Sequence, residues 1–103
     1  MKLILITSIK EDLQAVTHIM EQAGISVFSV SPIVGHKTEH HNYLVNNWFF
    51  GKNDSATDAL VFFSFTSDEA AQKALALTRA YNIEVPSNFP VRAFLLPVED
   101  SSL

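Results

Sequence analysis

The run Ala59-Leu-Val-Phe-Phe-Ser-Phe65 is strongly β-prone, and the fold can be worked out from its surroundings. Because aromatic and β-branched residues favour strands, we predict a strand over Asp58–Phe65. An earlier run, Ile25–Val34, alternates with period two and predicts another strand. The 23 residues Gly35–Thr57 separate the two runs, whereas a tight hairpin needs only about two to five residues. Long segments of this kind are commonly functional, so Gly35–Thr57 is the first candidate site.

A helix is predicted upstream of these strands, over Ile9–Ala23. Ser8 and Glu11 have the spacing of a capping box. Gly24 follows as the left-handed stop typical of a helix C-terminus. The apolar stripe of this helix has spacings of three and four and consists of Leu13, Val16, Met20 and Ala23.

A second helix follows the β-prone run and ends near Asn82. Thr66 and Glu69 form another capping-box pattern at its start. Ile83–Pro90 contains two prolines and is predicted to be a connection rather than an element. The inward face of this helix is predicted to hold Ala71, Ala74, Leu75, Thr78 and Tyr81.

Two further strands complete the pattern. Lys2–Thr7 is apolar at nearly every position, which predicts a strand covered on both faces, by helices or by another subunit. Val91–Val98 is the last strand before an acidic tail. The order is therefore β-α-β, long loop, β-α-β, which predicts an α+β ferredoxin-like sandwich (βαββαβ) with a long insertion between strands 2 and 3. Residues 1–103 form a single domain in this interpretation.

Composition restricts the classes of function. The chain is 48% hydrophobic and 17% charged, which is typical of a compact globule. A net charge of −4 with scattered basic residues argues against nucleic acid as a partner. The chain has no cysteine, and its apolar N-terminal run Leu3–Ile6 is too short for a signal peptide or a membrane helix. We therefore expect a cytoplasmic protein with no direct membrane insertion.

The predicted sheet has one face without a cover. Both helices pack on the opposite face, so a sheet rich in Phe, Val and Ile would expose a large apolar patch. Association with further copies of the chain through this face is the expected outcome.

Three of the four histidines lie in the long segment, in His36-Lys-Thr-Glu-His40-His41. Imidazole binds Zn, Cu or Ni, and Glu39 offers a carboxylate ligand. The alternative is that these are polar loop residues, solvated or paired with a neighbouring subunit. Both interpretations stay open, and His18 is expected to be a surface histidine.

The long segment also contains the aromatic run Trp48-Phe49-Phe50. Three consecutive aromatic side chains favour packing on the sheet or across an interface, although Trp48 also offers a stacking platform for a planar ligand. Arg92 begins the last strand beside an apolar stretch. A guanidinium there is either an inter-subunit ion pair or an anion ligand.

No arrangement of catalytic residues is present. The sequence has no Gly-rich phosphate loop of the P-loop or Rossmann type, no nucleophile elbow and no carboxylate pair at defined spacing. A non-enzymatic role is therefore expected, with a small cofactor-free monooxygenase of ferredoxin-like fold as a remote alternative.

The ending Phe94-Leu-Leu-Pro-Val-Glu99, the opening Met1-Lys-Leu-Ile-Leu-Ile-Thr7 and Gly35 at the start of the long loop resemble the PII signal-transduction proteins and their PII-like relatives. The resemblance covers almost the whole chain. It implies a homotrimer whose sheets pack together and whose T-loop, here the long segment, contacts a target protein. Small effectors, commonly adenine nucleotides, would bind in clefts between subunits.

Carried over residue by residue, the resemblance places the effector cleft at Gly35, His36, Lys37, Phe89 and Arg92. Arg92 falls where PII proteins have a phosphate-binding lysine. The glycines that approach phosphate in PII proteins are replaced by bulkier residues such as Phe89 and Pro90. The resemblance assigns target contact to Tyr43, Trp48, Phe49 and Phe50, and Tyr43 lies in the region of the modified tyrosine. A glutamine used for 2-oxoglutarate and magnesium is absent, which favours a divergent PII-like protein over a nitrogen sensor.

The alternative function is a metal-binding trimer, as in CutA-type proteins. It would use His36, His40 and His41.

Overall fold

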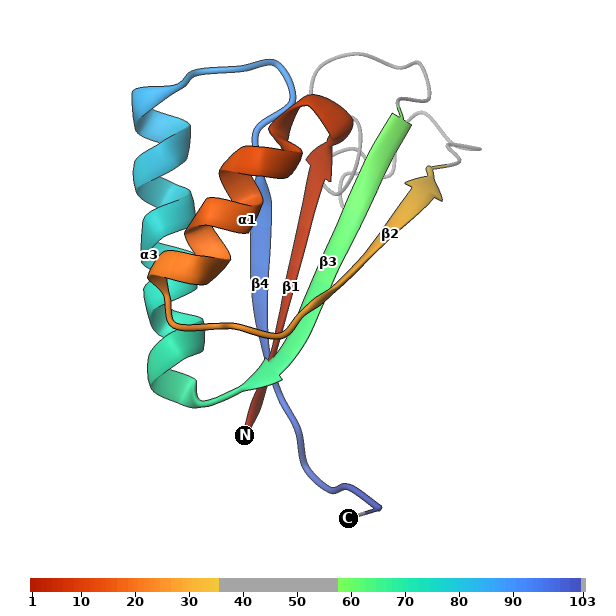
Figure 1. Cartoon of the computed structure of the whole chain (residues 1–103), viewed down its shortest axis with the longest axis vertical. Coiled ribbons are helices and arrows are strands. Elements are labelled where there is room, and N and C mark those ends of the chain that lie inside the picture. Colours follow the sequence, from red (N-terminus) through yellow and green to blue (C-terminus); the bar gives the residue numbers. More distant parts are fainter. Residues whose placement is uncertain (36–57, 103) are drawn as a thin grey trace, which may run out of the picture.

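The computed structural model describes residues 1–35 and 58–102. Within them, four antiparallel strands form one sheet in the order β2-β3-β1-β4, and both α-helices cover the same face of it (Figure 1). This arrangement confirms the predicted α+β ferredoxin-like fold. The elements are β1 (Lys2–Ile9), the 3-10 helix η1 (Lys10–Asp12), α1 (Leu13–Gln22), β2 (Ser29–Val34), β3 (Asp58–Thr66), α3 (Asp68–Glu84) and β4 (Arg92–Pro97).

The core lies between the sheet and the two helices. Alternate residues of a strand face opposite sides, so Ile4 and Ile6 of β1 and Phe62 of β3 point toward the helices and are fully buried. Small side chains on α3, Ala71 and Ala74, are also fully buried and allow the helix to approach closely. None of the helices in the described residues has the length and apolar content needed to cross a membrane.

The start of the first helix differs from the prediction. β1 continues to Ile9, which pairs with Ala59, and α1 begins only at Leu13 after the 3-10 turn. The predicted capping box is wrong, because the Ser8 hydroxyl donates to the carbonyl of Ile9 (3.0 Å) and caps no helix. Leu13, predicted to face inward, is 43% exposed instead.

The end of α1 confirms the prediction that Gly24 stops the helix. Gly24 has φ +84°, and its N–H donates to Glu21 O while the N–H of Ile25 donates to Met20 O. These two bonds make a Schellman motif. Ile25 belongs to that motif and not to a strand, and β2 begins only at Ser29, so it is shorter than the predicted strand.

The second helix is also capped differently from the prediction. Thr66 stays in β3, where it pairs with Lys2, and Ser67 is the N-cap whose side chain accepts from Ala70 N (3.2 Å). α3 then runs to Glu84, two residues beyond the predicted end.

The backbone nitrogens of the two prolines within the strands point to the free edges of the sheet. The N–H of Val98 donates to Met1 O. Since successive residues of an antiparallel strand direct their backbone groups to opposite edges, the backbone nitrogen of Pro97 points away from β1. Following the same alternation through β1 and β3 places Pro32 on the outer side of β2. The missing N–H of each proline is therefore not needed by the ladder, as is usual for proline at sheet edges.

The face of the sheet opposite the helices, here called the bare face, is strongly apolar. Phe65 on this face is 59% exposed, and Phe63 and Leu96 are also exposed. The bare face is formed by Leu3, Leu5, Thr7, Ile9, Ser29, Ser31, Ile33, Ala59, Val61, Phe63, Phe65, Arg92, Phe94 and Leu96.

Candidate functional site

Arg92 and Thr7 form a polar pair at one end of the apolar bare face. They are direct partners in the β1–β4 ladder, so both side chains rise from the same side of the sheet. Thr7 is only 4% exposed and Arg92 is half-buried. Burial lowers the pKa of the Arg92 guanidinium from its ordinary value. Among the described residues, no ion pair involves Arg92 and no hydrogen bond involves the Thr7 hydroxyl, so each keeps unused hydrogen-bonding capacity.

The connection between α3 and β4 leads directly into Arg92. Asn82 of α3 holds its end through two bonds, donating from Nδ2 to Val91 O (2.7 Å) and accepting from Val91 N at Oδ1 (3.1 Å). Within the connection the N–H of Phe89 donates to Ser87 Oγ (3.0 Å). The half-buried Phe89 lies in this connection, three residues before Arg92.

Gly35 lies at the same end of the sheet as Arg92 but on the other edge. It is buried and directly follows β2, whereas Arg92 begins β4 (Figure 1). The order β2-β3-β1-β4 puts three inter-strand spacings between these two strands, about 14 Å. The structure thus separates Arg92 from Gly35 within one chain.

The other predicted site residues lie outside the described residues. They are His36 and Lys37 of the effector cleft, Tyr43, Trp48, Phe49 and Phe50 of the partner loop, and His40 and His41 of the histidine cluster. Among residues 1–35 and 58–102, no group of three His, Asp or Glu side chains is placed to bind a metal ion. The metal hypothesis therefore remains a prediction about the segment 36–57.

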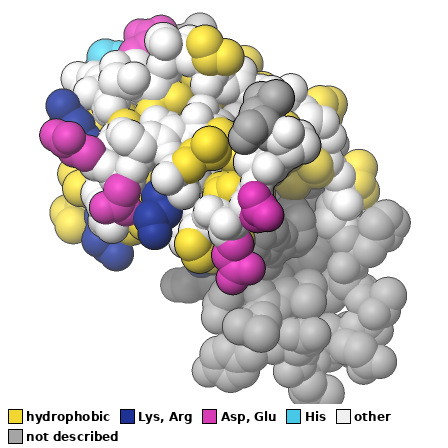
Figure 2. Space-filling view, turned by 90° about the horizontal axis from the view of Figure 1, so that it is seen from below, with side chains coloured by type: hydrophobic (Ala, Val, Ile, Leu, Met, Phe, Trp, Pro, Cys, Tyr) yellow, Lys and Arg dark blue, Asp and Glu magenta, His cyan; other side chains and the backbone are white. Residues whose placement is uncertain are grey.

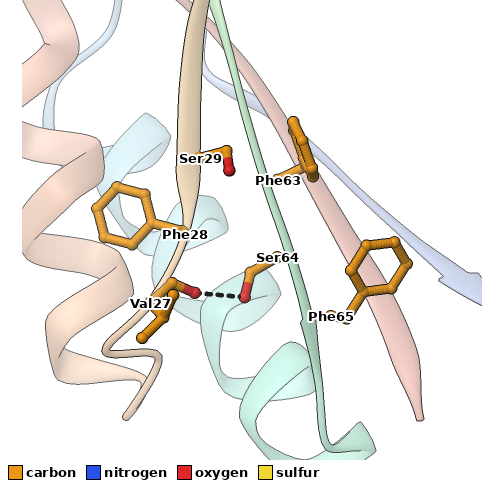
Figure 3. Close-up of a pocket in the computed structure, with 6 residues that line it drawn as sticks. All are labelled: Val27, Phe28, Ser29, Phe63, Ser64 and Phe65. Atoms are coloured by element: carbon orange, nitrogen blue, oxygen red, sulfur yellow. Dashed lines mark hydrogen bonds between the residues drawn. The ribbon is translucent and has the colours of Figure 1, made fainter. Parts of the chain in front are cut away.

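A small hollow lies at the opposite end of the sheet, where β2 diverges from β3. Its volume is about 230 Å³. The Ser64 hydroxyl donates to Val27 O (2.7 Å) and so joins β3 to the segment that precedes β2 (Figure 3). Figure 3 also shows Phe28 on one side of the strands and Phe63 and Phe65 on the other, as expected for alternating faces. The lining contains no charged side chain, so the hollow suits an apolar group and not an anion.

Two other hollows lie away from Arg92. A groove of about 310 Å³ between α1 and α3 is lined partly by His18 and Glu84, and His18 is exposed as predicted. A hollow of about 390 Å³ lies between Phe65, Met1 and the C-terminal residues. Neither is lined by Gly35, Phe89 or Arg92, so neither belongs to the predicted cleft.

Charged side chains do not form a single-sign surface on the face seen in Figure 2. Positive and negative groups are intermingled there, with apolar side chains between them. No continuous basic patch of the kind that binds a nucleic-acid backbone is seen on this face.

No protein-family model matches the chain, and no curated protein sequence matches it. A solved structure does match. It is that of a provisionally assigned PII-like signaling protein from Thermus thermophilus, with a TM-score of 0.56 over 91% of this chain and 82% of that chain. The fold is PII-like. At 14% identity the similarity establishes the PII-like fold and assigns no residue of the site.

Two residues of the site are not predicted from the sequence. In the sequence, Thr7 is only the end of an apolar strand. The one available signal is that a hydroxyl side chain directly follows Leu-Ile-Leu-Ile. The sequence marks Asn82 only as the end of a helix. The role of Asn82 depends on a contact with Val91, nine residues later, which no local pattern reveals.

Proposed function

We propose that the chain is a non-enzymatic PII-like regulatory protein that acts in the cytoplasm as a homotrimer. It binds a small effector, a nucleotide or another anion, in clefts between subunits. It contacts a target protein through the segment 35–57.

The separation of Gly35 from Arg92 is the observation that carries this proposal. Both residues lie at one end of the sheet, but on opposite edges. A cleft that uses both needs the β2 edge of one subunit next to the β4 edge of another. The similarity to a PII-like signaling protein supports the same arrangement.

The bare face supports association of subunits. It is rich in exposed Phe and Leu side chains, and apolar patches of this kind typically mark interaction sites. Packing three copies through their bare faces would cover this surface and bring the edges of neighbouring sheets together.

Light scattering coupled to size exclusion tests the assembly, and calorimetric titration tests the effector. We expect a mass of three chains and saturable binding of at least one ligand among ATP, ADP, AMP, cyclic nucleotides and bicarbonate. A monomeric mass at micromolar concentration would contradict the trimer. A panel without any binding would remove the effector from the proposal.

A further inference from the structure

The connection between α3 and β4 has few backbone donors left for a ligand. Pro86 and Pro90 have no N–H. Val85 N is bonded to Tyr81 O, Phe89 N to Ser87 Oγ and Val91 N to Asn82 Oδ1. In the described connection 85–91, only the N–H groups of Ser87 and Asn88 remain without a bond.

This loss of donors determines which anions the connection can hold. A polyphosphate is typically bound by several consecutive backbone N–H groups of a glycine-rich loop, which approach the oxygens closely. Here the bonds made by Asn82 and Ser87 occupy the N–H groups nearest to Arg92. A chain of phosphates would therefore find no backbone cradle beside the guanidinium.

The polar pair at the start of β4 suits a smaller ligand. Arg92 is the only charged side chain on the bare face of the described strands, so the face offers one positive charge. The guanidinium presents parallel N–H groups that match the two oxygens of a planar carboxylate. The buried Thr7 hydroxyl has no partner among the described residues, and such a group gains from an added hydrogen bond.

We propose that Arg92 and Thr7 bind a small planar oxyanion of the carboxylate or bicarbonate class, and that a nucleoside polyphosphate does not bind at this position. The inference rests on the proposed function, because it specifies the effector of the same inter-subunit cleft. The guanidinium holds two oxygens of the anion and matches its single charge, while the Thr7 hydroxyl contacts an oxygen from the neighbouring strand.

Calorimetric titration of the full chain tests this proposal with bicarbonate, acetate, inorganic phosphate, ADP and ATP as separate probes. We expect saturable binding of bicarbonate or acetate and none of ADP or ATP. Arg92→Gln should weaken anion binding about tenfold or more, because it removes charge-assisted hydrogen bonds. Arg92→Lys should weaken it less, since it keeps the charge but loses the planar fork.

Matched variants separate binding from folding. Thr7→Val should weaken anion binding severalfold and Thr7→Ser should restore it, with circular dichroism and subunit mass unchanged in each. Arg79→Gln removes an exposed positive charge of α3 and should leave binding intact.

Each other outcome overturns the proposal. Binding of ATP or ADP that depends on Arg92 would contradict it while leaving the proposed function standing. A trimer that binds none of the probes would overturn both this inference and the effector part of the proposed function. Anion binding unaffected by Arg92→Gln would place the site elsewhere in the protein.

Discussion

Tyr81 of α3 is linked to the 3-10 helix η1 through a single hydrogen bond. Its hydroxyl donates to Asp12 Oδ1 over 2.9 Å, and this bond, with burial and the negative charge of Asp12, raises the pKa of Tyr81 above 10.0. The bond requires the protonated phenol. Its contribution to stability is therefore fully present below about pH 10, the pKa in the unfolded chain, and is lost as the pH rises through the higher folded pKa.

Tyr81→Phe should lower the free energy of unfolding by about 1 kcal/mol at neutral pH, the usual net value of one hydrogen bond. Urea unfolding of both proteins across the alkaline range measures the effect. The difference between wild type and variant should shrink as the pH rises past the folded pKa of Tyr81. A difference that stays constant throughout would show that the hydroxyl bond does not contribute as described.

Asn82 is a second residue whose side chain determines the position of a neighbouring segment. Asn82→Ala removes both bonds to Val91 and should cost about 1–3 kcal/mol, because two backbone groups lose their partners. Amide exchange of Val91 should accelerate in the variant. Asn88→Ala, an exposed change in the same connection, is the control and should leave that exchange rate unchanged.

At the scale of elements, the N-terminus of α3 allows the predicted and observed caps to be compared directly. Ser67→Ala removes the observed cap bond to Ala70 N and should destabilise the protein by about 0.5–2 kcal/mol. Amide exchange at Ala70 should increase. Thr66→Ala should leave exchange at Ala70 unchanged, because Thr66 belongs to β3. Faster exchange at Ala70 in Thr66→Ala but not in Ser67→Ala would show that Thr66 is the N-cap.

The types and order of the elements could be predicted from the sequence, because apolar periodicity reflects burial directly. Their ends were less predictable. Ser8 lies in a capping-box pattern, but pairing of Ile9 with Ala59, fifty residues away, extends β1 past it. Tertiary pairing overrides a local signal in such cases. The site was only partly predictable for the same reason: Arg92 is conspicuous in the sequence, whereas Thr7 becomes its neighbour only through the β1–β4 register.

At the scale of the whole molecule, the bare face should decide the state of association. Phe65→Asp places a charge at its most exposed aromatic position and should shift the subunit mass from trimer toward monomer. Ile83→Asp is the control, because Ile83 is 81% exposed at the end of α3, on the other side of the sheet. Light scattering measures both. A variant Phe65→Asp that keeps the wild-type mass would exclude the bare face as the interface.

The prolines at the sheet edges affect how readily the protein would aggregate. A chain that exposes a long apolar sheet with two free edges risks the indefinite strand addition that produces fibrils. Pro32 and Pro97 each remove an outward N–H from one edge, so neither edge can offer an unbroken row of donors to an incoming strand. Protection against aggregation is therefore provided at the same two edges that the proposed closed ring of subunits would bring together.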